Sequence, residues 1–261
     1  MIPIKAITSK ENPLYKFIKS LNQKKVRESK KLFLVEGIRL TEEIVKSGVK
    51  IKYLIINEAV KNFPQVNNDC CVLRLKNSLF KNLSETITPQ GIIAVVKHVD
   101  IPLSKVKLGI HPFIVILDGL QDPGNVGAII RTAAATGSSA VFFTNGSAEL
   151  YNPKVVRSTM GSLFQVPIVN KLDSDLLIKW LDERSINIVV ADLNSEECYY
   201  CADLRKSLAL VVGNENKGPG VAWKRAAKKI VKIPMLGLTE SLNASVAAGV
   251  LIYEVIRQRS I

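Results

Sequence analysis

The sequence predicts an α/β protein of two domains, the second of which is built on a parallel sheet. From residue 113 onward, short segments that are apolar throughout alternate with helical patterns, as in a parallel sheet covered on both faces. Several of these segments end in loops rich in Gly and Asn. The excess of positive charge lies almost wholly in the first half. With 261 residues, 47% of them hydrophobic, the chain can bury a core in each domain.

The first half predicts a small α/β domain. Residues 12–29 are expected to form a basic helix, because Leu14, Phe17, Ile18 and Leu21 recur near helical spacing. Strands are expected at 32–35, 52–56, 71–75 and 92–96, with a helix at 38–46. Residues 99–112 contain prolines and charges without a period, which indicates a linker. The predicted domains are therefore 1–98 and 113–261.

The second half is more regular. Strands are expected at 113–118, 140–144, 187–191, 208–213 and 229–233. Helices are expected at 126–136, 152–162, 173–183 and 243–257. This order predicts a parallel sheet with helices on both faces.

The charge asymmetry indicates a polyanionic partner for the first half. Residues 1–110 contain 20 Lys and Arg against 9 Asp and Glu, whereas residues 111–261 contain 16 against 14. A lysine-rich surface often serves solubility alone, but solubility does not require the excess on one half. No basic amphipathic helix rich in aromatic residues supports membrane binding, so a nucleic acid is the favoured partner.

The same composition bears on location and metals. No apolar run approaches the roughly 20 residues that span a bilayer, and the N-terminus lacks a signal-peptide pattern, so a cytoplasmic location is expected. Cys198 and Cys201 have a CxxC spacing that suits zinc or a redox couple. Cys70 and Cys71 are adjacent, and His98 and His111 have no ligand spacing, so reduced thiols and no metal are expected.

Three segments of the second half combine Gly, Asn and a charged residue after an apolar run. They are 118–131 (DGLQDPGNVGAIIR), 212–218 (VGNENKG) and 233–245 (IPMLGLTESLNAS). Ligands of open α/β sheets bind beyond the carboxyl ends of the strands. The three loops therefore predict one composite pocket.

The order and spacing of these segments resemble the SpoU/TrmH branch of the SPOUT RNA methyltransferases. Residues 9–13 (SKENP) and 33–39 (FLVEGIR) resemble the start of that family's RNA-binding domain. The resemblance implies a deep trefoil knot in 113–261, a homodimer with its active site at the dimer interface, and an N-terminal domain similar to ribosomal-protein folds. It also implies methyl transfer from S-adenosylmethionine to a ribose 2′-hydroxyl of RNA, with 23S ribosomal RNA the expected substrate. No metal is required for this transfer.

The resemblance assigns catalytic roles to residues in all three segments: Asn125, Arg131, Glu215, Ser241 and Asn243. In the family the matching arginine is held to activate the 2′-hydroxyl. Because a guanidinium stays protonated, Arg131 could instead grip a phosphate and position the hydroxyl. Glu215 is expected to fix the pocket and to pair with a cation, with Arg131 as a candidate. The alternatives from the residues alone are a helix cap for Asn125, Ser241 or Asn243, and a surface charge for Arg131 or Glu215.

The resemblance also names binding residues. Those expected at the cofactor are Gly213, Asn214, Glu215, Gly218, Ile233, Met235, Leu242, Asn243 and Ser245. Those expected at RNA are Asn12, Lys16, Arg27, Arg39 and Arg157, whereas Glu36 is expected to hold the fold. The chain departs from the family at Asn216, where glycine is usual, and at Ala244, where valine is common; Asn accepts a positive φ almost as readily as Gly.

Three other functions compete with this prediction. A transfer RNA could be the substrate, or the chain could be an RNA-binding or ribosome-assembly protein without catalysis. A nucleotide-dependent oxidoreductase would need a GxGxxG turn after the first strand of the sheet, and 119–127 (GLQDPGNVG) does not have that spacing.

Overall fold

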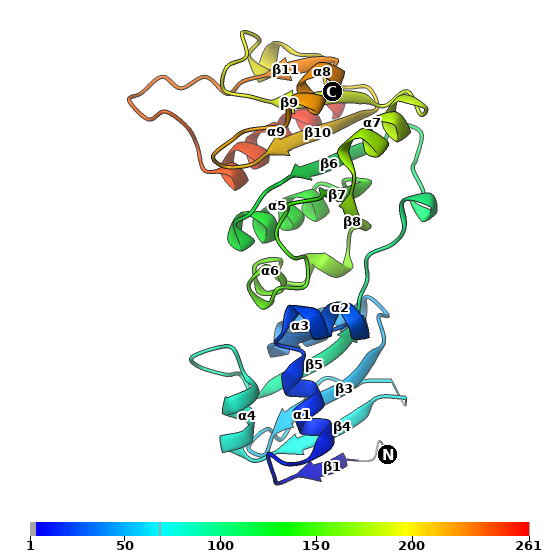
Figure 1. Cartoon of the computed structure of the whole chain (residues 1–261), viewed down its shortest axis with the longest axis vertical. Helices are drawn as coiled ribbons and strands as arrows, with labels where there is room; N and C mark the ends of the chain where they lie inside the picture. The colour runs from blue at the N-terminus through cyan, green and yellow to red at the C-terminus, as the bar shows by residue number, and fades with distance from the viewer. Residues whose placement is uncertain (1–3, 68, 261) are drawn as a thin grey trace. The chain divides into compact units, whose positions relative to one another are not determined.

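The computed structural model describes residues 4–67 and 69–260, which divide into two compact units (Figure 1). The first unit contains the chain up to Val99 together with residues 151–164; the second contains 100–150 and the chain from Gln165. The sequence prediction assigned 151–164 to the second domain. The structure groups this segment with the first unit because Tyr151 stacks on His98, with 3.7 Å between ring centroids, and lies 4.6 Å from the Phe33 ring.

The described part of the first unit contains a five-stranded mixed sheet in the order β1-β4-β3-β5-β2. Strands β1, β4 and β3 are parallel, and β5 is antiparallel to β3 and to β2. Its strands are β1 (Ile4–Ile7), β2 (Leu32–Glu36), β3 (Ile51–Asn57), β4 (Cys71–Leu75) and β5 (Ile92–Lys97). Its helices are α1 (Pro13–Ser20), α2 (Lys24–Lys30), α3 (Ile38–Lys46), α4 (Asn77–Leu83) and α6 (Pro153–Ser158), followed by a 3₁₀ turn at Ser162–Phe164.

The single helix expected at 12–29 is two helices. Gln23 has extended backbone angles (φ −89°, ψ 129°), so the chain turns between α1 and α2. The Arg27 side chain is 3% exposed and donates hydrogen bonds to the carbonyls of Leu21 and Asn22, at 2.9 and 2.7 Å. A buried arginine thus satisfies the carbonyls that the turn leaves open, a device that hydrophobic spacing does not reveal.

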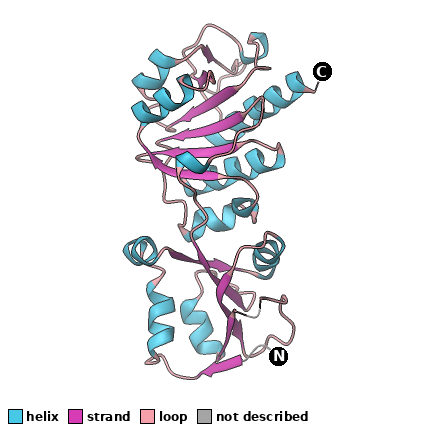
Figure 2. Ribbon diagram, turned by 90° about the vertical axis from the view of Figure 1, so that its right-hand side faces the viewer, coloured by secondary structure: helices cyan, strands magenta, loops and turns pink. Residues whose placement is uncertain are grey.

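The second unit is built on a six-stranded sheet in the order β11-β9-β10-β6-β7-β8, and every pair of neighbouring strands is parallel (Figure 2). The strands are β6 (Phe113–Asp118), β7 (Ala140–Thr144), β8 (Ile168–Leu172), β9 (Asn187–Ala191), β10 (Leu208–Gly213) and β11 (Lys229–Val231). The helices are α5 (Pro123–Ala135), α7 (Ser174–Asp182), α8 (Val221–Ala226) and α9 (Ala244–Arg259). Short 3₁₀ turns lie at Leu103–Lys105 and Tyr199–Cys201.

Helices cover both faces of this sheet. On one face, Leu177 and Leu181 of α7 and Trp223 of α8 pack against alternate residues of the strands, such as Ile116 and Val211. On the other face, α5 and α9 pack against each other. Small residues in both helices, including Gly127 and Ala133 in α5 and Ala248 in α9, are buried or half-buried, which permits this close approach.

The strand order fixes where a ligand can bind. From the central strand β6 the chain passes outward through β7 and β8, and then returns to build β9, β10 and β11 on the other side. The loops after β6 and β10 therefore diverge at a topological switch point, where open α/β sheets form their binding crevice. No helix within the described residues is both long enough and apolar enough to cross a membrane.

Candidate active site

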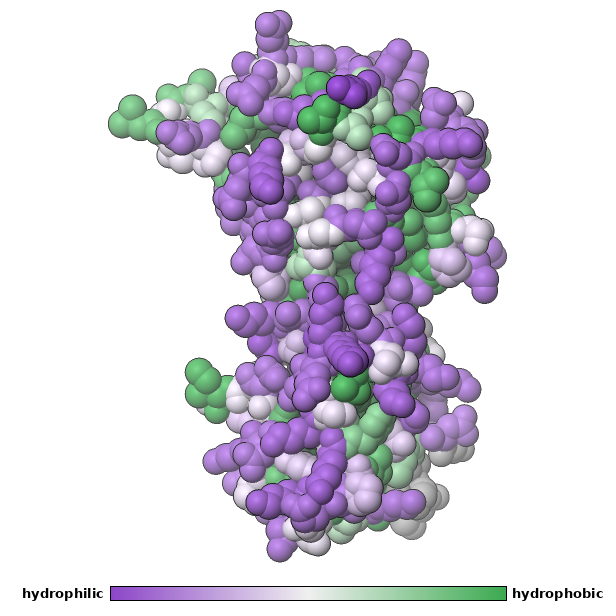
Figure 3. All heavy atoms as spheres, viewed as in Figure 1, coloured by the Kyte–Doolittle hydropathy of each residue, from purple (hydrophilic) through white to green (hydrophobic). Residues whose placement is uncertain are grey.

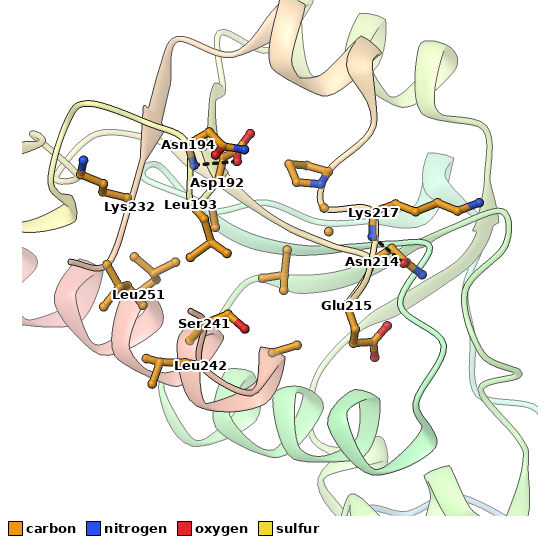
Figure 4. Close-up of a pocket in the computed structure, with 18 of the residues that line it drawn as sticks. Asp192, Leu193, Asn194, Asn214, Glu215, Lys217, Lys232, Ser241, Leu242 and Leu251 are labelled. Carbon is orange, nitrogen blue, oxygen red and sulfur yellow. Dashed lines mark hydrogen bonds between the residues drawn. The ribbon is translucent and has the colours of Figure 1, made fainter. Parts of the chain in front are cut away.

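A cavity of about 490 Å³ lies at the carboxyl ends of β9, β10 and β11, where the loops after these strands meet α5 and α9. This volume is in the range of small-molecule sites. Figure 4 shows Leu193, Leu242 and Leu251 toward one end and Glu215 at the other. The lining includes most of the residues predicted to bind the cofactor, namely Gly213, Asn214, Glu215, Gly218, Ile233, Met235, Leu242 and Asn243.

The loop after β10 folds back tightly on itself. A Cβ atom on Gly213 would lie 2.1 Å from the backbone nitrogen of Pro219, so no other residue fits there. The Asn214 carbonyl accepts from the Gly218 N–H at 2.9 Å, and the Asn214 side chain accepts from the N–H groups of Asn216 and Lys217. The loop is therefore closed by its own hydrogen bonds and leaves the side chains of Glu215, Asn216 and Lys217 exposed.

Glu215 joins this loop to the loop after β6. Its carboxylate accepts hydrogen bonds from the N–H groups of Gln121 and Asp122, at 3.2 and 3.1 Å, and from Nδ2 of Asn125 at 3.1 Å. Partial burial raises the pKa of the carboxyl, but the hydrogen bond from its own backbone N–H and those from Asn125, Asp122 and Gln121 together stabilise the charged form more, so the net pKa is lowered. Glu215 is thus an anion held by amides.

Asn125 extends the connection to the third loop. Its side chain is 8% exposed, and its Oδ1 accepts from Nδ2 of Asn243 at 2.9 Å. Oδ1 of Asn243 in turn caps α9, accepting from the Ser245 N–H at 2.9 Å and from the Ser245 hydroxyl at 2.6 Å. Because Glu215 can only accept, the NH₂ group of Asn125 must face it, and this fixes the orientation of both amides. One hydrogen-bonded chain therefore joins the three predicted segments.

Asp118 braces the same loops from the other side. Its Oδ2 accepts from the Gly220 N–H at 2.8 Å, and its Oδ1 accepts from the Thr144 hydroxyl at 2.9 Å. Asn214 Nδ2 adds a hydrogen bond to the Gly119 carbonyl at 2.8 Å. Both ends of the loop after β10 are therefore tied to the end of β6, although the sequence prediction gave Asp118 no role.

The structure corrects three details of the predicted site. Asn125 lies inside α5, and Asp122 caps that helix instead by accepting from the Asn125 N–H. Among the described residues no ion pair joins Glu215 to Arg131, whose side chain is exposed on α5. Asn216 is not among the residues with positive φ, so the loop does not need the conformation that glycine favours at that position.

The remaining predicted residues of the second unit have separate places. Ser241 lines the cavity. Ser245 does not line it, but its hydroxyl donates to the α9 cap. Asn243 is the cap of the last helix, as one of the two alternatives for that segment predicted.

Of the residues expected at RNA, three have side chains that solvent can reach, and two make hydrogen bonds with backbone groups of the protein. Lys16 and Arg39 are exposed, and Arg157 of α6 is half-buried. Asn12 caps α1 through its side-chain oxygen, which accepts from the Leu14 and Tyr15 N–H groups. The expectation for Arg27 was wrong, because a guanidinium that is 3% exposed and bonded to two carbonyls cannot contact a phosphate.

Glu36, expected to hold the fold, does so. Its carboxylate accepts from the Thr86 hydroxyl at 2.6 Å, from the Glu85 N–H at 3.1 Å and from the Ser84 hydroxyl. It thereby anchors the segment that follows α4.

Sequence reasoning missed one wall of the cavity. Asp192, Leu193 and Asn194 follow β9, and Lys224 of α8 and Lys232 lie beside them. The rule that selected the other loops required Gly together with Asn and a charged residue after an apolar run, and it passed over 192–197 (DLNSEE) because this segment contains no Gly. Among the described residues no group of three or more His, Cys, Asp or Glu gathers as a metal site would require.

Comparisons with known proteins agree with this geometry. Residues 112–253 match the SpoU rRNA Methylase family, and residues 12–94 match the MRM3-like substrate binding domain. The 23S rRNA (guanosine(2553)-2′-O)-methyltransferase RlmP of Bacillus subtilis is 32% identical over 96% of this chain and 98% of its own length. The 23S rRNA (uridine(2479)-2′-O)-methyltransferase of Streptomyces viridochromogenes is 29% identical, over 87% and 83% of the two chains.

A solved structure leads to the same family. The AdoMet-bound rRNA methyltransferase from Sinorhizobium meliloti superposes with a TM-score of 0.88 at 30% identity, covering 97% of this chain and 98% of the other. The chain therefore belongs to the SpoU rRNA methylase family, and the family predicted from the sequence is confirmed. The relatives named above are RNA 2′-O-methyltransferases or AdoMet-bound methyltransferases, which is the class of enzyme and of cofactor that the sequence predicted.

Proposed function

We propose that this protein transfers a methyl group from S-adenosylmethionine to a ribose 2′-hydroxyl of 23S ribosomal RNA. The observation that carries the proposal is the hydrogen-bonded chain from Glu215 through Asn125 to Asn243, which closes three loops of a SpoU-family sequence around one cavity. Two curated relatives that match most of the chain methylate 23S rRNA at a ribose.

The residues around the cavity fit the proposed cofactor. The cavity combines the apolar side chains of Leu193, Leu242 and Leu251 with polar groups of the loop after β10, as a site for an adenosyl group requires. The absence of a side chain on Gly213 keeps that loop closed on Pro219. When bound, the cofactor supplies an electrophilic methyl group. The loops of the protein would hold it and exclude water, since alignment of the reactants accounts for much of such a rate enhancement.

Arg131 is the proposed catalytic contact with RNA. It projects from α5, six residues after Asn125 on the same helix, and its side chain is exposed. A guanidinium keeps its proton and binds phosphate with paired donors. Arg131 would therefore fix the phosphate next to the target ribose and polarise the hydroxyl, rather than accept its proton.

The first unit is proposed to deliver the RNA. Exposed lysines lie on α1 and α2 and around them, at Lys10, Lys16, Lys19, Lys24 and Lys25. Phosphate contacts of this kind give an affinity that falls steeply with salt and carries little sequence preference. The target nucleotide would then be selected by RNA shape around the 2′-hydroxyl.

Two further features are proposed from the family: the trefoil knot and a homodimer in the cytoplasm. Support for the homodimer comes from apolar side chains that are exposed to solvent in the single chain and that a second copy of the chain would cover. Leu236 and Leu238 in the loop before α9 are 97% and 106% exposed, and Val246 and Tyr253 on α9 are 52% and 56% exposed. Figure 3 shows hydrophobic residues over this loop at the upper left. Exposed apolar patches mark interaction sites.

Light scattering tests the homodimer. The wild type is expected to have the mass of a dimer, and Leu236→Glu with Leu238→Glu is expected to shift it toward the monomer. The matched control is Ile87→Glu, since Ile87 is 101% exposed in the first unit. A monomeric wild type, or an equal effect of the control, would contradict the proposal.

Methyl incorporation tests the activity. Labelled S-adenosylmethionine, 23S rRNA and total transfer RNA are incubated with the wild type, Arg131→Ala and Arg131→Lys, and mass spectrometry locates the methyl group. We expect labelling of a ribose 2′-oxygen in 23S rRNA, reduced about 10²-fold or more in both variants, with cofactor affinity unchanged. If transfer RNA is labelled instead, the substrate is a transfer RNA and the proposal of 23S rRNA is wrong. RNA binding without labelling, on free rRNA and on ribosomal particles, would favour the binding-protein alternative.

A further inference from the structure

Asp192 is a nearly buried carboxylate on the wall of the cavity, and none of the contacts described above uses it. It directly follows β9, its side chain is 10% exposed, and it lines the cavity together with Leu193 and Asn194. Figure 4 shows Asp192 and Asn194 side by side and joined by a hydrogen bond. A carboxylate in such a place must be stabilised by partners.

Two partners hold Asp192 in its charged form. Oδ2 lies 2.5 Å from Nζ of Lys224 in α8, and Oδ1 accepts from the Asn194 N–H at 3.1 Å. Burial raises the pKa of the carboxyl, but the hydrogen bonds from Lys224 and Asn194 and the charge of Lys224 together lower it. A carboxylate offers about four acceptor positions on its two oxygens. Among the described residues these two contacts use two of the positions, which leaves the others for a ligand in the cavity.

The place of Asp192 in the sheet indicates which ligand group it would meet. β9 is the parallel, hydrogen-bonded neighbour of β10, and the tight glycine-bearing loop follows β10. In nucleotide-binding α/β sheets, a glycine-rich loop follows one strand, and an acidic residue at the end of the neighbouring strand accepts hydrogen bonds from ribose hydroxyls. Here Gly213 lies at the end of β10 and Asp192 follows the neighbouring strand β9, so the glycine and the acid have the same relative positions, although the loop sequence differs.

We infer that Asp192, oriented by Lys224, binds the ribose hydroxyls of the cofactor's adenosyl group. The inference rests on the proposed function, since it names a contact within the same site. Glu215, Asn125 and Asn243 occupy the side of the cavity next to α5 and Arg131, and Asp192 lies on the wall formed by β9 and α8. The two sets of residues would thus divide the work, one at the reacting centre and one at the nucleoside.

Calorimetry with two compounds related to the cofactor tests this assignment. S-adenosylhomocysteine carries both the adenosyl group and the amino-acid tail, whereas 5′-methylthioadenosine lacks the tail. Asp192→Asn should weaken both by the same factor, about 10- to 100-fold, as expected for hydrogen bonds to a charged acceptor. Loss confined to S-adenosylhomocysteine would assign Asp192 to the tail and overturn the inference, as would no loss for either.

A deoxy analogue separates a direct contact from a general disturbance. The 2′,3′-dideoxy form of 5′-methylthioadenosine should bind the wild type about 10- to 100-fold more weakly than the parent compound, and Asp192→Asn should hardly distinguish the two. An equal preference in both proteins would refute the contact. This comparison uses the wild type as its own reference, so it holds even if the variant is less stable.

The matched control is Glu197→Gln. Glu197 pairs with Lys229 at 2.6 Å and is 35% exposed on its side chain, but it does not line the cavity. Glu197→Gln should leave the affinities for S-adenosylhomocysteine and 5′-methylthioadenosine unchanged.

The proposed function and the inference fail in different ways. If the wild type does not bind S-adenosylhomocysteine at all, the proposed function is refuted. If the wild type and Asp192→Asn bind it equally well, only the role of Asp192 is refuted.

Discussion

Replacing Asn125 by Asp should destabilise the protein at neutral pH and hardly at all in mild acid. The substitution preserves shape but places a carboxyl where Nδ2 of Asn125 lies 3.1 Å from Oε1 of Glu215. When protonated, the introduced carboxyl can donate to Glu215 and accept from Asn243, as the amide does. When ionised, it repels Glu215 and loses the donated hydrogen bond.

The magnitude follows from the distance. Two unit charges 3.1 Å apart repel by about 5 kcal/mol at an effective dielectric of about 20 and by about 1 kcal/mol in water. Position 125 is buried but Glu215 is exposed, so we take an intermediate cost of about 2–3 kcal/mol. At about 1.4 kcal/mol per unit, this raises the pKa of the introduced carboxyl from about 4 to about 6. The cost therefore appears above pH ~4 and levels off above pH ~6.

Urea unfolding of the wild type and variant at several pH values between 4.5 and 7.5 measures this difference. Asn12→Asp is the matched control: Asn12 caps α1 with its side-chain oxygen, and Asp serves equally well as a cap. The difference from wild type should grow with pH for Asn125→Asp and stay within about 0.5 kcal/mol for the control. A difference that is independent of pH would refute the proposed orientation of the amide chain.

Two further substitutions test the site and the first unit. Gly213→Ala should reduce the affinity for S-adenosylhomocysteine at least tenfold, because the added Cβ meets the Pro219 nitrogen at 2.1 Å, whereas Gly237→Ala, with no atom within 4 Å, should bind normally; calorimetry compares the two. Arg27→Leu should lower the stability of the first unit by about 2–3 kcal/mol through the lost charged hydrogen bonds, as measured by thermal circular dichroism. Lys24→Ala, at an exposed lysine of the same helix, should instead weaken RNA binding and leave the melting temperature unchanged.

The strands of the second unit could be predicted because burial on both faces leaves a continuous apolar sequence. The expected segments 113–118, 140–144, 187–191 and 208–213 coincide with β6, β7, β9 and β10. β8 at Ile168–Leu172 was missed, because only its first two residues are buried and the polar residues Asn170 and Lys171 interrupt the apolar pattern. Edge strands lack the second covered face that produces the signal.

The site was predictable to the level of loops and only in part to the level of bonds. Gly, Asn and a charge after a strand identified the three loops that meet at the cavity. The partner of Glu215 was predicted as a cation and proved to be a set of amides, because backbone N–H groups leave no trace in the sequence. Arg27 was predicted to contact RNA for a similar reason, since its partners are backbone carbonyls.

The position of residues 151–164 limits how the protein can be dissected. A fragment ending in the linker would carry every strand of the first sheet yet lack α6, Tyr151 and Phe164, which cover the fully buried Phe33. That fragment would expose an aromatic surface and be prone to aggregate. The first unit is therefore built from two separate segments of the chain. To produce it as an intact fragment, residues 151–164 would have to be joined to the first segment through an engineered linker.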